Sequence, residues 1–344
     1  MSLIWKNNVQ RRQKDWIIDY SFFIYNGSYA YKHPCPNAPE KWAKKCRPDC
    51  KLCDGSAKLY MKSKSGHVTG GIYSILKQAI ERAKEGYNIY TVFDPPKDQL
   101  DRTKLLDTYK GNRPDVPEWI THQMDWGQQL LPHTGIKCYY SHNAESDDVM
   151  ATLALELAAE GHEVVVASDD KDMFPLLANP KIRLFRQKEF FGVAKFKDWL
   201  KSKHKVVIDD PGRFNEFLAI CGDAADNFNL ISGLGPVAAE YIIKNYTSCM
   251  EIFDKFNTLP EKYQRKLVQC NKGTEKCKHK GSCLTCGSYV KTLKDDMDLS
   301  LRIATLVTDA KYICVNKEQD RIKVKRMLES LDLKEAVDNI NYLF

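Results

Sequence analysis

The sequence predicts an α/β fold with a largely parallel central sheet flanked by helices. Three short runs of apolar, β-branched and aromatic residues end in aspartate: 16–18 before Asp19, 89–93 before Asp94, and 164–168 before Asp169 and Asp170. Continuous runs of this kind are typical of parallel strands that are buried on both faces. Segments with a helical pattern lie between them, and strands that alternate with helices favour a parallel sheet.

The helical segments can be placed from their spacing. Residues 70–84 carry apolar side chains on one helical face, and residues 147–160 show the same pattern. The second segment ends at Gly161, and glycine commonly follows the end of a helix. A further apolar run at 217–220 is also predicted to be helical.

Composition limits the class of protein. The 344 residues include 28% charged and 43% hydrophobic residues, as in an ordinary globular protein, with a formal net charge of +7. No run of about 18 apolar residues is present, and residues 1–14 lack the apolar core of a signal peptide. We therefore expect a cytoplasmic protein that makes no membrane contact.

Acidic side chains follow the predicted strands and open the predicted helices. Ligands of open parallel sheets bind beyond the carboxyl ends of the strands, so these acids are expected to meet at one edge. Clustered carboxylates select hard cations such as Mg²⁺ or Mn²⁺, and two such ions about 4 Å apart support phosphodiester hydrolysis. The candidates are Asp19, Asp94, Glu145, Asp147, Asp148, Asp170, Asp172, Asp223 and Asp226.

Each of these acids also has an ordinary structural explanation. Glu145, Asp147 and Asp148 would open a helix, where negative charge is favourable in any protein. Asp19 and Asp170 could cap the turns that follow their strands. The convergence of several acids at one edge is what favours a metal site.

Four motifs resemble those of the flap endonuclease and 5′-3′ exonuclease family, in particular its free-standing, phage-type members. They occur along this chain in the same order as in the family. Residues 145–148 resemble the family's Glu-Ala-Asp-Asp, 168–172 its Ser-x-Asp-Lys-Asp, and 222–227 its Gly-Asp-x-x-Asp-Asn. Phe93-Asp94, Arg102 and residues 109–113 resemble its Phe-Asp…Arg…Tyr-Lys-x-x-Arg block. The similarity covers roughly residues 15 to 250 and implies a PIN-like nuclease fold.

The resemblance also implies a role for each residue. One metal would be held by Asp19, Asp94, Glu145 and Asp147, and the other by Asp170, Asp172 and Asp226, with Asp147 shared. Asp148 and Asp223 would complete or orient the ligand shells. Lys110 and Arg113 would contact the scissile phosphate, whereas Arg102 either does likewise or pairs with one of the acids.

A glycine-rich turn points to duplex binding. Gly233, Gly235 and Val237 surround a proline that suits the first turn of a helix, and backbone N–H groups at such a start can hold a phosphate. The segment resembles the family's helix–three-turn–helix, which implies sequence-independent DNA contacts and a K⁺ ion in the turn. A Gly-x-Gly-Pro turn by itself is also a plain helix start.

Eight of the twelve cysteines form two sets that suit tetrahedral structural zinc. The first set is Cys35, Cys46, Cys50 and Cys53, and the second is Cys270, Cys277, Cys283 and Cys286. Two separate zinc sites and ligands exchanged between the sets both remain open, as do free thiols in loops. Both sets lie in lysine-rich insertions, which either extend a nucleic-acid surface or are solvated faces.

The expected organisation is a nuclease domain over residues 1–210 and a DNA-binding and C-terminal region over 211–344. The zinc-binding insertions fall at about 32–56 and 268–288. A short arch falls at about 109–140, with a helix at 117–131.

The expected activity is two-metal cleavage of DNA near single-strand/duplex junctions, with RNA primers as a second substrate. Partners would be DNA with 5′ flaps or ends, RNA–DNA hybrids and replication proteins, with the chain a monomer. Two rival functions are a non-catalytic zinc-containing module for branched nucleic acid and a PIN-like single-strand ribonuclease.

Overall fold

A computed structural model describes residues 13–40, 44–51, 56–96, 99–231, 233–268 and 288–344. Its centre is a seven-stranded sheet with the order β8-β7-β6-β1-β4-β5-β9. The strands are β1 (Lys14–Asp19), β4 (Asn88–Phe93), β5 (Lys137–Tyr140), β6 (Glu163–Ala167), β7 (Ile182–Arg186), β8 (Glu189–Phe191) and β9 (Ile313–Cys314). The described part of the chain contains no helix long and apolar enough to span a membrane.

The predicted fold class is confirmed. The five central strands, β7 to β5, pair in parallel, and β8 and β9 add antiparallel edges. β1, β4 and β6 correspond to the three apolar runs that the sequence assigns to strands. The sequence analysis did not predict β5 or β7. β5 is only four residues long and begins with a lysine, and β7 contains two arginines among its apolar residues.

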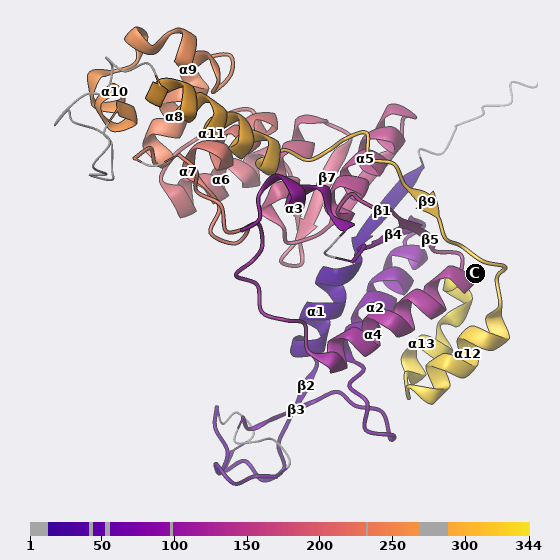
Figure 1. Ribbon diagram of the computed structural model, residues 1–344. Coiled ribbons are helices and arrows are strands. Elements are labelled where there is room, and N and C mark those ends of the chain that lie inside the picture. The colour runs from indigo at the N-terminus through magenta and orange to yellow at the C-terminus, as the bar shows by residue number, and fades with distance from the viewer. Residues whose placement is uncertain (1–12, 41–43, 52–55, 97–98, 232, 269–287) are drawn as a thin grey trace, which may run out of the picture.

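Helices cover both faces of the sheet (Figure 1). Alternate residues of β1 point to opposite faces: Ile17 packs in the core beside α5 (Ser146–Ala159), while Trp16 and Ile18 pack in the core beside α1 (Tyr20–Ala30) and α2 (Gly70–Lys84). The helices predicted at 70–84 and 147–160 are therefore confirmed. The run at 217–220 is helical as expected, in α7 (Phe214–Cys221).

The helix predicted at 117–131 is present as α4 (Glu118–Leu130), and it packs into the domain. Gln123 is fully buried, accepts a hydrogen bond from the backbone N–H of Gly71 in α2 (2.7 Å) and donates one to Ser28 in α1 (2.9 Å). α4 thus belongs to the α1–α2 layer. The chain that crosses near the carboxyl edge of the sheet is α3 (Asp101–Leu105) and the irregular segment after it.

A helical arm extends from one side of the sheet (Figure 1). It contains α6 (Val193–His204), α7, α8 (Pro236–Asn245), α9 (Glu251–Asp254), α10 (Glu261–Val268) and α11 (Ser288–Ala304). The chain then returns to the sheet through β9 and ends in α12 (Arg321–Ser330) and α13 (Lys334–Asp338), the latter packed on α2. The C-terminal residues therefore lie on the nuclease part, while the boundary predicted between residues 210 and 211 stays a prediction.

Candidate active site

Three of the predicted acids lie at the carboxyl ends of neighbouring strands. Asp19 ends β1 and caps α1, accepting a hydrogen bond from the backbone N–H of Phe22 (3.0 Å). Asp94 follows β4 and accepts from the backbone N–H of Ser146 (3.3 Å), the first residue of α5. Asp170 follows β6 and caps the 3-10 helix η3 (Lys171–Ala178). The parallel register of these strands brings the three turns to one edge.

A second group of carboxylates comes from η3 and the loop after α7. Oxygen atoms of Asp172, Asp223 and Asp226 all lie within 4.8 Å of one another. One oxygen of Asp172 is buried and makes no hydrogen bond, although Lys171 lies 3.5 Å from it. Lys171 also donates to Asp223. The donor set and this buried carboxylate oxygen fit a hard divalent cation.

Burial and mutual repulsion disfavour the charged form of several of these acids. Burial raises the pKa of Asp19 to about 7, with smaller contributions from Asp94 and Asp170, against hydrogen bonds from Ser168 and Phe22. Burial likewise raises the pKa of Asp172 to about 8. The pKa of Asp147 is raised well above its usual range by burial and, to a smaller extent, by the charges of Asp170 and Asp19. The role of Asp147 as a ligand shared by two ions stays a prediction.

Glu145 is held by three donors. The side chains of Arg102 and Lys110 both donate to it, and the Tyr109 hydroxyl lies 3.0 Å from one of its oxygens. The same hydroxyl lies 3.1 Å from Asp226, so Tyr109 connects both groups of acids. Burial would raise the pKa of Glu145, but Lys110 and Arg102 outweigh it and hold that pKa below its usual value.

Arg102 is a buried ion-pairing residue. Its guanidinium forms two hydrogen bonds with Asp148, at 2.6 and 3.0 Å, and a further one to the backbone carbonyl of Thr305 (2.9 Å). Of the two roles the sequence left open, the geometry supports pairing with an acid over DNA contact. Asp148 also accepts from the backbone N–H of Val307 (2.8 Å), so its oxygens are engaged by protein donors.

Lys110 and Arg113 lie at the rim of the same site. Arg113 donates to Asp226 (2.7 Å), and Lys110 adopts a left-handed backbone conformation (φ 52°) with its own N–H bonded to the carbonyl of Asp226 (3.0 Å). Both cations therefore face the acids, where a phosphate bound to metal would lie. Their contact with a scissile phosphate stays a prediction.

Three residues of the site were not singled out from the sequence. Ser168 donates to Asp19 (2.7 Å) and accepts from the N–H of Asp170 (3.1 Å), joining two strand ends. Lys171 and Tyr109 hold the acids as described above. All three lie inside the motifs quoted above, and their position in those motifs could have identified them as site residues.

The glycine-rich turn forms the start of α8, as expected. Gly233 has φ 88°, Gly235 precedes the helix, and Pro236 occupies its first turn. Val237 is 61% exposed. The backbone at this helix start is open to solvent around Gly235, since a Cβ there would meet nothing within 4 Å.

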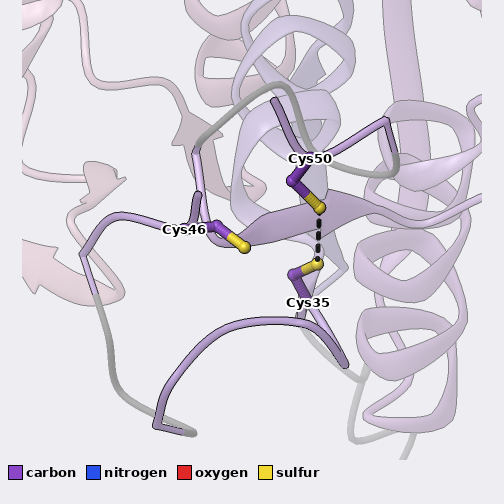
Figure 2. Close-up of side chains that lie close together, drawn as sticks. All are labelled: Cys35, Cys46 and Cys50. Carbon is purple, nitrogen blue, oxygen red and sulfur yellow. Dashed lines mark hydrogen bonds between the residues drawn. The ribbon is translucent and has the colours of Figure 1, made fainter. Parts of the chain in front are cut away.

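Three cysteines of the first set come together (Figure 2). Sulfur atoms of Cys35, Cys46 and Cys50 all lie within 4.8 Å of one another, and the Cys35–Cys50 distance is 3.8 Å. Tetrahedral zinc with Zn–S bonds of about 2.3 Å requires sulfur atoms about 3.8 Å apart. Cys53 and the second set, Cys270, Cys277, Cys283 and Cys286, lie outside the described residues.

Fold and site together define a nuclease-type α/β protein with a carboxylate-lined catalytic edge. Residues 55–203 match a family described as 5′-3′ exonuclease, N-terminal resolvase-like domain. Flap endonuclease Xni of Cronobacter sakazakii is 28% identical over 226 residues, which are 65% of this chain and 83% of that protein. A 5′-3′ exonuclease of Aquifex aeolicus is 25% identical over 311 residues, 85% of this chain and 95% of that protein.

The bacteriophage T5 enzyme provides a structural comparison. Its structure as a 5′-exonuclease with bound zinc ions has a TM-score of 0.54 at 17% identity, covering 96% of this chain and 100% of that one. Its structure as a flap endonuclease with DNA and metal ions has a TM-score of 0.52 at 16% identity, covering 96% and 99%. These similarities show the fold. In sequence and in fold the chain is similar to the flap endonucleases and 5′-3′ exonucleases.

Proposed function

We propose that this protein is a structure-specific 5′ nuclease that hydrolyses DNA phosphodiesters near single-strand/duplex junctions, with RNA primers as a second substrate. The observation that carries the proposal is the convergence of acids from three strand ends and the loop after α7. A non-catalytic binding module would have no need for carboxylates whose pKa values are raised by burial and, secondarily, by one another's charge.

The acids divide into two ligand groups. Asp19, Asp94, Glu145 and Asp147 would hold one divalent ion, and Asp170, Asp172 and Asp226, with Asp147 shared, the other. We expect Mg²⁺ or Mn²⁺, which would activate a water molecule and stabilise the departing oxygen. Asp223 lies among the second group and is oriented by Lys171.

The remaining residues of the site would bind the DNA or orient the metal ligands. Lys110 and Arg113 would turn from the acids to the phosphate and stabilise the charge that develops on its oxygens. Arg102 and Asp148 act as a buried pair that fixes Glu145. The start of α8 would hold the duplex backbone without reading its sequence, and K⁺ in that turn is part of the proposal.

The test compares a 5′-flap duplex, a blunt duplex and single strands as substrates, with Mg²⁺ and with EDTA. We expect metal-dependent cutting near the junction of the flap substrate, leaving a 5′-phosphate. The matched variant is Asp170→Asn, which removes one negative charge and keeps the shape of the side chain. Tight junction binding without cutting under any metal would overturn the nuclease assignment.

We further propose that Cys35, Cys46 and Cys50, with Cys53 from outside the described residues, bind one structural zinc ion. The 3.8 Å sulfur–sulfur distance matches the tetrahedral geometry, and these thiols are buried at the centre of their own small cluster. The second set is proposed to bind another zinc from its spacing. Metal analysis should find two zinc ions per chain and one in Cys35→Ser; unchanged zinc in that variant would refute the first site.

A further inference from the structure

The first cysteine insertion is a separate small body on the nuclease fold. It leaves at the end of α1 through a hairpin of β2 (Lys32–Pro34) and β3 (Lys58–Tyr60). Its buried residues, chiefly the three thiols and Ala57, form a cluster apart from the two main cores. A segment with so little apolar core requires a cross-link to stay folded, which fits the zinc proposed above.

Aromatic rings fix the base of this insertion to the domain. The Tyr29 ring of α1 lies 5.3 Å from the Trp119 ring of α4, and the Tyr60 ring of β3 lies 5.2 Å from Trp119. The ammonium group of Lys32 lies 4.6 Å from the centre of the Tyr60 ring. The base of the hairpin is therefore packed against α1 and α4.

The insertion presents a basic surface. Its exposed cations are Lys44, Lys45, Arg47, Lys51 and Lys58, against the exposed acids Glu40 and Asp49. Within the described residues none of the five cations forms an ion pair. A surface held in place with unpaired positive charge is complementary to a polyanion.

Its position relative to the active site is set by α1. This helix starts at Asp19 and runs to the hairpin over 11 residues, a length of about 16 Å. In Figure 1 the hairpin of β2 and β3 lies below the sheet and the helix α8 lies above it. Nucleic acid that reached the site from α8 and continued in the same direction would run towards the insertion.

We propose that the cysteine insertion is a second DNA-binding element. It binds the phosphate backbone of the double-stranded arm that lies beyond the scissile phosphate, on the side away from α8. Lysine and arginine bind phosphates without reading bases, so this contact does not depend on the DNA sequence. The proposal rests on the nuclease function and adds which part of the substrate the insertion recognises.

The test uses the full chain with its thiols intact. The quadruple variant Lys44→Gln, Lys45→Gln, Arg47→Gln and Lys51→Gln removes four charges from the insertion. A control, Lys317→Gln, Arg321→Gln, Lys325→Gln and Arg326→Gln, removes four exposed charges from α12 and the segment before it. Zinc content and circular dichroism establish that both variants are folded.

DNA affinity is measured by fluorescence anisotropy in EDTA at several salt concentrations. One substrate is a duplex with a 5′ single strand, and the other adds a second double-stranded arm beyond the junction. We expect the insertion variant to bind the two-arm substrate more weakly, with a salt slope reduced by about 1 to 4, and the one-arm substrate normally.

Each alternative outcome overturns the proposal. A salt slope for the two-arm substrate that is unchanged, that is equally reduced in the α12 control, or that is reduced to the same extent for the one-arm substrate refutes the second-arm contact. The nuclease function is tested separately, by measuring whether the unmodified protein cleaves the flap substrate in Mg²⁺. That result is independent of the binding measurements on the two variants.

Discussion

The buried pair of Arg102 and Asp148 offers the sharpest test of how the active site is built. The side chains of both residues are almost fully buried, and Arg102 also donates to Glu145. In Arg102→Met the positive charge disappears while the length of the side chain is kept. Asp148 is then left with the backbone N–H of Val307 as its donor among the described residues.

The magnitude follows from this pairing. Removing one partner of a buried ion pair costs about 3–5 kcal/mol, because the other charge stays buried without its partner. The double variant Arg102→Met with Asp148→Leu removes both charges and leaves the N–H of Val307 without an acceptor, which costs about 1–3 kcal/mol. We therefore expect the double variant to recover about 2 kcal/mol of the stability that the single variant loses.

Activity should not recover with stability. In both variants Glu145 keeps Lys110 and Tyr109 but loses Arg102, one of the groups that orient it. Loss of a group that orients a metal ligand commonly weakens metal binding by about 10- to 100-fold. We expect the Mg²⁺ concentration for half-maximal cleavage to rise by this factor in both variants, with KM for DNA little changed.

The two quantities are measured separately. Urea unfolding in EDTA gives the free energy of unfolding, and cleavage of a 5′-flap substrate over a Mg²⁺ titration gives the metal requirement. Asp148→Asn, a milder change, serves if Arg102→Met does not fold. Equal destabilisation in the single and double variants, or an unaltered Mg²⁺ requirement, would refute the reasoning.

The other expectations concern single groups of the edge. Asp170→Asn should lower the cleavage rate by about a thousand-fold, equivalent to several kcal/mol of lost metal stabilisation, while gel-shift affinity for the flap stays unchanged; retained cutting would exclude Asp170 as a ligand. Tyr109→Phe removes one hydroxyl shared by Glu145 and Asp226, and should cost about 1 kcal/mol of stability and raise the Mg²⁺ requirement; unaltered Mg²⁺ dependence would make the hydroxyl dispensable. In the metal-free protein the raised pKa values of Asp19 and Asp172 mean that the folded state binds more protons than the unfolded one between about pH 4 and 8. Its stability should therefore fall as pH rises through this window, and Mg²⁺ should offset the fall; a flat or rising profile would contradict the shifts.

Much of the site was predictable because its residues lie at the ends of strongly patterned segments. The runs before Asp19, Asp94 and Asp170 read as buried strands, and parallel strands place their carboxyl ends together. The start of α8 was readable for a similar local reason, since proline and glycine mark helix boundaries. In these cases the residue types of a short segment, together with the direction of the strands, were sufficient to predict where the side chains lie.

The partners of Arg102 could not be read in this way. Its contact with Thr305 joins positions 203 residues apart, and the contact of Asp148 with Val307 joins positions 159 apart. Neither leaves a periodic or motif signal in the sequence. The packing of α4 was hidden for the same reason, because the partners of Gln123 lie in other helices.

The return of the chain after α11 explains how the helical arm and the catalytic edge act as one unit. The side chain of Asn215 in α7 donates to the Thr305 hydroxyl (2.8 Å), while the Thr305 carbonyl accepts from Arg102. A displacement of α7 and α11 relative to the sheet would therefore strain the donors that hold Asp148 and, through Arg102, Glu145. Because α8 packs on α7, duplex bound at the arm, as proposed, would favour the arrangement in which these donors are in place. The contacts thus connect the helices proposed to bind the duplex with the donors that hold Asp148 and Glu145.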